Sequence, residues 1–106
     1  MADWDNYKTT RLAEAFLTCK SISQIKKFLR DLLTEEEIIE FGNRLFIAEL
    51  LYSGTLYTQI EKSTGMSSTT IARISKWLRR GMGGYNYVIN RLHQHDSALR
   101  KVFHRK

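Results

Sequence analysis

Apolar residues recur at spacings of three and four along most of the chain, and no run alternates apolar with polar residues between turn residues. Such a pattern predicts helices and no strands. Six glycines and no proline are present, so we expect glycine turns between the helices. The chain of 106 residues is long enough for one modest core. We therefore predict one all-α domain over residues 1–106, with about six helices.

The first helix starts are marked by capping sequences. A first helix is predicted over residues 7–19, with Cys19 buried on its apolar face. Ser21 and Gln24 have the Ser-x-x-Gln spacing typical of a helix N-terminus, and Thr34 and Glu37 repeat it as Thr-x-x-Glu. A second helix should therefore begin at Ser21, and a third at Thr34.

The third predicted helix, running to about Ser53, is the most apolar part of the chain. Between residues 38 and 52, ten of fifteen residues are apolar, and the other five do not form one continuous face. A helix that is apolar nearly all round must be buried nearly all round. A small monomer has few helices to cover it, so we expect a homodimer. A central helix in a compact monomer is the alternative.

Residues 57–79 have the pattern of a helix-turn-helix. Gly65 can adopt the left-handed conformation of a tight turn, and Ser67 can cap the helix that follows. Residues expected to pack around this turn are Tyr57, Ile60, Met66, Ile71, Ile74 and Leu78. The second helix would then present short hydroxyl or methyl groups and two cations to DNA. These candidate DNA-binding residues are Ser67, Ser68, Thr69, Thr70, Ala72, Arg73 and Lys76. An ordinary pair of antiparallel helices is the alternative.

The net charge of +6 is concentrated in the C-terminal third. Residues 1–72 carry 8 basic and 10 acidic side chains, whereas residues 73–106 carry 9 basic side chains and one acidic side chain, Asp96. A segment this basic attracts nucleic acid or an anionic membrane surface. A solvated basic helix that only aids solubility is the alternative.

The rest of the sequence excludes several other functions. No apolar stretch is long enough to cross a membrane, and the first residues are acidic where a secretory signal is basic, so we expect a cytoplasmic protein associated with the nucleoid. A last amphipathic helix is predicted after Gly84, from Tyr85 to Phe103. His93 and His95 have the wrong spacing for a helical metal site, so no metal is expected.

Several separated motifs together resemble the Trp repressor superfamily, and most closely its YerC/YecD branch of bacterial transcriptional regulators. These motifs are the run at residues 32–37, Gly42-Asn43-Arg44-Leu45, Glu49-Leu50-Leu51, Gly54, Gly65 and Thr70-Ile71-Ala72-Arg73. The resemblance covers about residues 10–85. It implies an intertwined helical homodimer whose two reading helices enter successive major grooves of a double-stranded DNA operator.

The same resemblance implies an effector pocket, lined here by Leu33, Thr34, Arg44 and Arg73. Ile74 stands where the Trp repressor has a glycine, and Trp77 where it has a serine. Both residues add bulk to the space that an indole would occupy. We therefore expect no tryptophan cofactor, although the two arginines could hold another anion.

Three classes of function follow from these patterns. The first is a sequence-specific DNA-binding regulator, most simply a repressor, that uses its helix-turn-helix as a homodimer. The second is a helical protein-interaction or assembly module that retains the fold without specific DNA binding. An enzyme is not expected, because the chain offers no paired acid and base, no phosphate loop and no activated nucleophile.

Overall fold

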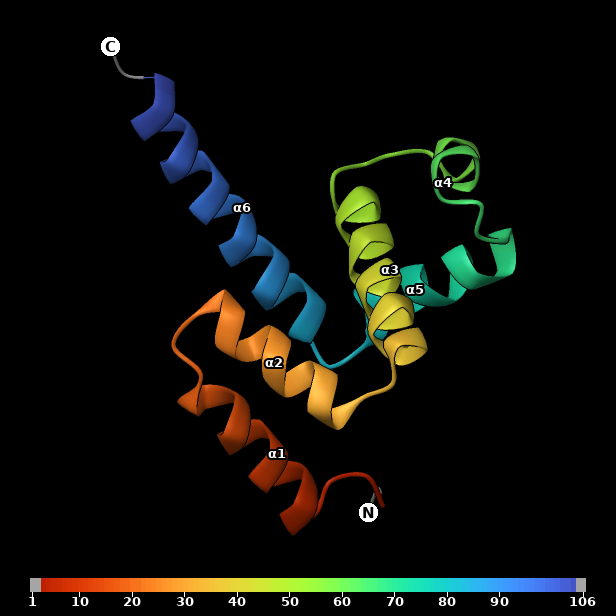
Figure 1. Cartoon of the computed structure of the whole chain (residues 1–106). Coiled ribbons are helices and arrows are strands. Elements are labelled where there is room, and N and C mark those ends of the chain that lie inside the picture. Colours follow the sequence, from red (N-terminus) through yellow and green to blue (C-terminus); the bar gives the residue numbers. More distant parts are fainter. Residues whose placement is uncertain (1–2, 105–106) are drawn as a thin grey trace. The chain divides into compact units, whose positions relative to one another are not determined.

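A computed structural model describes the backbone of residues 3–104 and the side chains of residues 3–96. Within this range the chain forms six helices and no strand (Figure 1), which confirms the all-α prediction. The helices are α1 (Tyr7–Thr18), α2 (Ile22–Leu32), α3 (Glu35–Tyr52), α4 (Tyr57–Thr64), α5 (Ser68–Arg80) and α6 (Gly84–His104). No helix in the described part is long and apolar enough to cross a membrane.

The chain divides into two compact units, residues 1–40 and residues 41–106, and α3 runs from the first into the second. Each unit has its own internal packing. The prediction of one domain over residues 1–106 stays a prediction.

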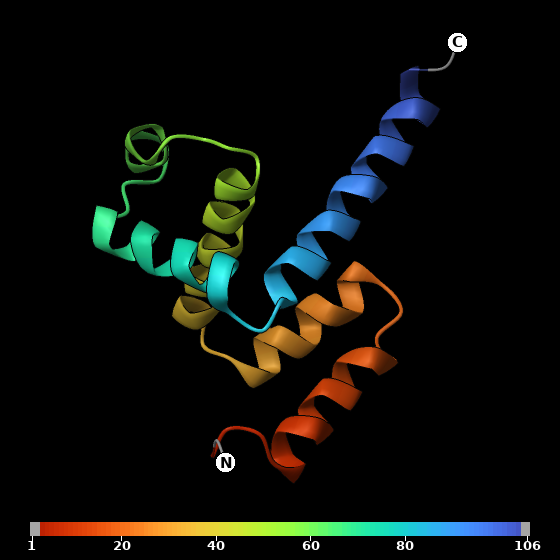
Figure 2. The ribbon, with the colours of Figure 1, turned by 180° about the vertical axis from the view of Figure 1, so that it is seen from behind.

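In the first unit, α1 and α2 lie side by side in both ribbon views (Figures 1 and 2). The rings of Phe16 and Phe28 meet edge to face, with their centroids 5.3 Å apart. Neither helix contains a fully buried residue. Cys19 follows α1 as its C-cap and is only half-buried, so the expectation of a buried cysteine was wrong. The reason is that this helix pair encloses no core.

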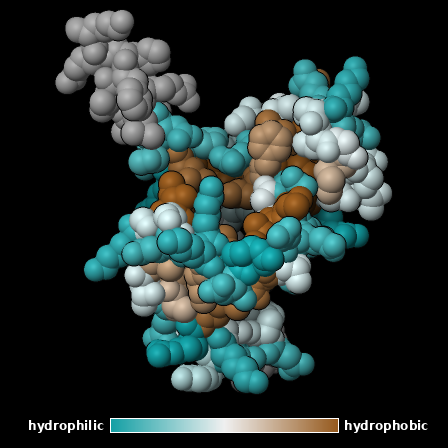
Figure 3. All heavy atoms as spheres, in the orientation of Figure 1, coloured by the Kyte–Doolittle hydropathy of each residue, from teal (hydrophilic) through white to brown (hydrophobic). Residues whose placement is uncertain are grey.

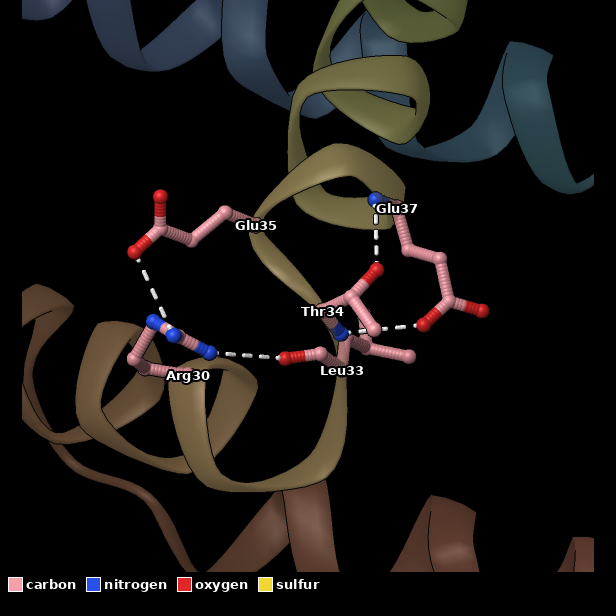
Figure 4. A network of polar contacts seen from close by, with 5 residues as sticks. All are labelled: Arg30, Leu33, Thr34, Glu35 and Glu37. Carbon is pink, nitrogen blue, oxygen red and sulfur yellow. Dashed lines mark hydrogen bonds and ion pairs between the residues drawn. The ribbon is translucent and has the colours of Figure 1, made fainter.

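The junction between α2 and α3 is held by local hydrogen bonds (Figure 4). The Thr34 hydroxyl accepts from the Glu37 backbone N–H at 3.1 Å, while the Glu37 carboxylate accepts from the Thr34 N–H at 2.9 Å. This reciprocal pair is the predicted capping box. Arg30 closes the turn by donating to the Leu33 carbonyl at 3.1 Å and to the Glu35 carboxylate at 3.2 Å.

The hydrophobic core lies in the second unit and joins α3, α4, α5 and α6. Its buried members are Ile47, Ala48, Ile60, Ile71, Ile74 and Ile89. Met66 and Leu78 pack against this core as predicted. Tyr57 does not lie inward as predicted, since it is 39% exposed at the first position of α4.

The sequence predicts that α3 is buried on nearly all sides, but within one chain most of its residues are not buried. Only Ile47 and Ala48 of this helix are buried, while Ile39, Phe41 and Phe46 are exposed. Hydrophobic residues, brown in Figure 3, reach the surface on the face of the molecule that this view shows. The exposed apolar side chains of α3 therefore lack a covering surface in the chain by itself.

The last helix packs through fewer residues than its sequence pattern predicts. Ile89 is buried and Tyr85 is half-buried, whereas Val88 and Leu92 are exposed. The side chains of Leu99, Val102 and Phe103, predicted on the same face, lie outside the described residues. The predicted amphipathic helix is present, and only part of its described apolar face is covered.

Candidate nucleic-acid interface

The turn between α4 and α5 has the geometry that its glycine predicts. Gly65 has φ of 71° and ψ of 6°, in the left-handed region, and its N–H donates to the Glu61 carbonyl at 2.9 Å. Thr64, which the sequence analysis did not single out, also fixes this turn. Its hydroxyl donates to the Ile60 carbonyl at 2.7 Å and accepts from the Met66 N–H at 3.1 Å.

Ser67 caps α5 as predicted, and Thr70 takes part in the same cap. The Ser67 hydroxyl accepts from the Thr70 N–H at 3.2 Å, and the two hydroxyl oxygens lie 3.1 Å apart. Thr70 is half-buried, while Ser68 and Thr69 are exposed. The hydroxyl of Thr70 is therefore engaged in the cap, and that of Thr69 lies open at the first turn of the helix.

The remaining candidate residues share one face of α5. Ile71, Ile74 and Ser75 are buried and define the inner side of the helix. Successive residues of an α-helix are rotated by about 100°, so positions separated by three, four, seven and eleven lie on one side. The exposed residues at these positions, opposite the buried side, are Thr69, Ala72, Arg73, Lys76 and Arg80. We call these five residues the α5 stripe.

Arg79 does not belong to the α5 stripe. Its Nε donates to the backbone carbonyl of Ser75, a buried residue, at 3.4 Å. The guanidinium therefore lies along the edge of the helix. Over its whole length, from Ser68 to Arg80, α5 contains four basic residues and no acidic one. Its exposed side thus carries positive charge and no acidic side chain of its own, which suits contact with phosphates.

The four residues of the expected effector pocket belong to different units of the chain. Leu33 and Thr34 belong to the first unit and take part in the α2–α3 junction. Arg44 and Arg73 belong to the second unit, where Arg44 is half-buried and Arg73 is exposed. The pocket itself stays a prediction. Ile74, expected to fill it, is 1% exposed and forms part of the hydrophobic core.

Two aromatic rings lie beside the Arg44 guanidinium. Its central carbon is 5.4 Å from the ring centroid of Phe41 and 5.6 Å from that of Trp77. Both distances fall within the range of cation–π attraction. Burial raises the pKa of the Tyr85 phenol, and the positive charge of Arg44 opposes this rise. The i, i+3 spacing of Phe41 and Arg44 on a helix could have indicated the first contact from the sequence.

A second polar group joins α3 to α6. The Nε2 atom of His93 lies 3.7 Å from a Glu49 carboxylate oxygen, and its ring meets that of Tyr52 edge to face at 5.3 Å. Asn90 donates to the Tyr52 hydroxyl at 3.3 Å. The described residues contain no cluster of three metal-ligating side chains, and His93 serves here in packing.

Comparison with known proteins agrees with this architecture. The family model described as Trp repressor protein matches residues 8–93. The chain belongs to the Trp repressor family. This is a family of regulatory proteins, and the match confirms the resemblance stated from the sequence motifs.

Individual proteins similar to this member of the Trp repressor family agree with the family match. The chain is 31% identical over 87 residues to YerC, an uncharacterized protein of Bacillus subtilis, covering 82% of this chain and 84% of YerC. A TrpR-like protein from Eubacterium eligens has a crystal structure that matches with a TM-score of 0.80 at 30% identity, covering 85% of this chain and 93% of that one. A candidate Trp repressor from Staphylococcus aureus matches with the same TM-score of 0.80 at 27% identity, covering 88% and 96%.

Proposed function

We propose that this chain is a sequence-specific transcriptional regulator that binds double-stranded DNA as a homodimer and reads the operator with α5. The observation that carries this proposal is the α5 stripe. It combines a small hydroxyl residue at the helix N-terminus with three cations along the same exposed face. A helix of this kind can bring its first turn to base edges while its cations bind phosphates.

Within the stripe, the residues have different roles. Thr69 and Ala72 are small enough for close approach to a base edge, where a methyl group also suits contact with thymine. Arg73 lies one turn further along and can reach either a guanine or a phosphate. Lys76 and Arg80 lie nearer the C-terminus of α5 and bind the phosphate backbone of the DNA. Ser67 and Thr70 act through the cap, which fixes the first turn of α5.

The proposed homodimer would supply the covering surface that α3 lacks within one chain. It would also present two copies of α5 to the DNA. In helix-turn-helix dimers, the Trp repressor among them, the reading helices enter successive major grooves about 34 Å apart. That spacing is a property of those dimers. It predicts an operator with two related half-sites.

Selection of bound sequences from a random duplex library tests the proposal. We expect enrichment of a pseudo-palindrome with half-sites about one helical turn apart. Enrichment of no sequence would favour the alternative, a helical interaction module that retains the fold without specific DNA binding.

Two substitutions in the stripe should then have different effects. Thr69→Ala should reduce discrimination between the selected operator and its single-base variants, by about 1–3 kcal/mol for a lost base contact. Lys76→Ala should weaken binding to all duplexes alike and lower the slope of log affinity against log salt by about 1. Fluorescence anisotropy titrations at several salt concentrations measure both effects.

Lys26→Ala is the matched control for Lys76→Ala, because it removes the same charge from an exposed position on α2. It should change affinity and salt dependence much less. Equal effects of the two lysine substitutions would show that net charge, and not the face of α5, governs binding. Operator binding unaffected by either stripe substitution would show that another element reads the DNA.

A further inference from the structure

The Arg44 guanidinium bridges two helices of the second unit. It extends from α3, where it lies near the exposed ring of Phe41, to the indole of Trp77 on α5. Trp77 is 39% exposed, so much of this large ring is not part of the hydrophobic core. The position of such a ring depends on the groups beside it more than that of a buried ring does.

Trp77 is also placed so that it influences the α5 stripe. It directly follows Lys76, and it lies about one helical turn after Arg73. A contact that holds Trp77 therefore adds to the buried Ile74 in fixing the rotation of the C-terminal half of α5 about its own axis. The N-terminal half is fixed separately by the cap at Ser67 and the core residue Ile71.

Arg44 also acts electrostatically on Tyr85 of α6. Burial raises the pKa of its phenol while Arg44 acts in the opposite direction, so the guanidinium lies within electrostatic reach of α6 as well. Arg44 thus lies beside rings of α3 and α5. A guanidinium suits this role because its planar face stacks on aromatic rings.

We propose that Arg44 and Trp77 form an internal clamp that sets the orientation of α5 on α3, so that the chain reaches its DNA-binding form without a small-molecule effector. This inference rests on the proposed function and adds how the site is regulated. The indole of the chain itself supplies the aromatic surface against the arginine. Both residues act through α5, as positioning residues, and neither is required to touch DNA.

The test is a double-substitution cycle on operator affinity. Arg44→Met removes the charge and keeps the length of the side chain, and Trp77→Leu removes the aromatic face and keeps an apolar group. An exposed cation–π contact corresponds to about a two- to fivefold change in affinity, which is the loss expected for each single substitution. The double variant should bind the operator no more weakly than the single variant with the lower affinity, because each single substitution already removes the same contact.

Two further variants separate positioning from folding. Trp77→Phe keeps an aromatic face for Arg44 and should recover most of the lost affinity. Tyr87→Leu is the matched control, because it deletes another cation–π contact, in which the Arg91 guanidinium carbon lies 3.6 Å from the Tyr87 ring centroid. That contact lies within α6 alone and joins no two helices. Tyr87→Leu should leave operator affinity unchanged.

Fluorescence tests the clamp without DNA. Trp4 and Trp77 are the two tryptophans, and Trp4 is 56% exposed near the start of the chain, so a Trp4→Phe background isolates the signal of Trp77. Arg44→Met in this background should lower the steady-state anisotropy of Trp77, because the released indole gains motion. Anisotropy equal to that of the parent would contradict the clamp.

The remaining outcomes also decide the question. Additive losses in the double variant would show that Arg44 and Trp77 act separately, and would overturn the proposal. A change of sedimenting mass in Trp77→Leu would show that Trp77 acts in chain association instead. If the unsubstituted protein enriches no duplex, the proposed function fails, and the anisotropy of Trp77 alone decides whether the contact fixes α5.

Discussion

Residues 1–40 and residues 41–106 are both built from amphipathic helices, but they differ in what those helices enclose. The helices α1 and α2 contain no fully buried side chain. In the second unit, five isoleucines and one alanine from four helices form a core that is almost completely shielded from water. The same unit contains the helix-turn-helix and the α5 stripe.

This difference shows which part of the chain can be stable without a further surface packed against it. A segment of about 40 residues seldom buries enough apolar surface to fold alone. In the first unit Tyr7, Leu17 and Ile22 are each more than 70% exposed. A covering surface would bury these side chains, and the second copy in the proposed dimer is one source of it. The first unit and the exposed side of α3 would then serve assembly, while the α5 stripe of the second unit would serve recognition.

The largest expected effect is on the core of the second unit. Ile47→Ala should lower the free energy of unfolding by about 2–5 kcal/mol, because Ile47 is fully buried and the change leaves a cavity. Lys27→Ala, at an exposed position on α2, should cost less than about 1 kcal/mol at the same protein concentration. Chemical denaturation measures both values. The reverse order would contradict the contrast between the two units.

A smaller effect is expected where α5 ends. A Cβ atom added to Gly81 would lie 2.3 Å from the Trp77 carbonyl oxygen, so Gly81→Ala should force the end of the helix to shift, at a cost of about 1–3 kcal/mol. Gly84→Ala is the control, because a Cβ there meets no atom within 4 Å. It should leave stability unchanged or raise it slightly, since alanine favours the helix that begins at this residue. Thermal denaturation of the two variants side by side would refute this account if Gly81→Ala were as stable as Gly84→Ala.

The smallest expected effect is that of tryptophan. A ligand of the native state at 100 times its Kd would stabilise the protein by about 2.7 kcal/mol, which corresponds to a shift of several degrees in Tm. We expect millimolar tryptophan to leave both Tm and operator affinity unchanged, because Trp77 already lies against Arg44. A tryptophan-dependent rise in Tm together with tighter operator binding would identify the chain as a tryptophan sensor.

The local features of the fold could be predicted from the sequence because their causes are local. The left-handed Gly65, the Ser67 cap and the Thr34–Glu37 capping box each depend on residues within four positions of one another. The apolar spacing on α5 likewise identified Ile71 and Ile74 as core residues. Short-range rules are sufficient for such features.

Features that depend on distant residues could not be predicted in this way. The sequence pattern indicated a buried Cys19, but burial requires a neighbouring core that the first unit does not contain. The sequence shows only the bulk of Trp77, since its contact with Arg44 joins residues 33 positions apart. The sequence pattern places Thr70 among the outward residues, although its hydroxyl takes part in the Ser67 cap. In each case tertiary packing or a competing hydrogen bond decided the outcome.

The central claim is that two copies of the chain assemble and bind DNA together. The mass of the free protein and of its complex with DNA tests this claim most directly. Sedimentation of the full chain at micromolar concentration should give about twice 12.4 kDa without DNA, and two chains per duplex with the selected operator. A chain that stays folded at 12.4 kDa, and that binds the operator as one copy per duplex, would contradict the account.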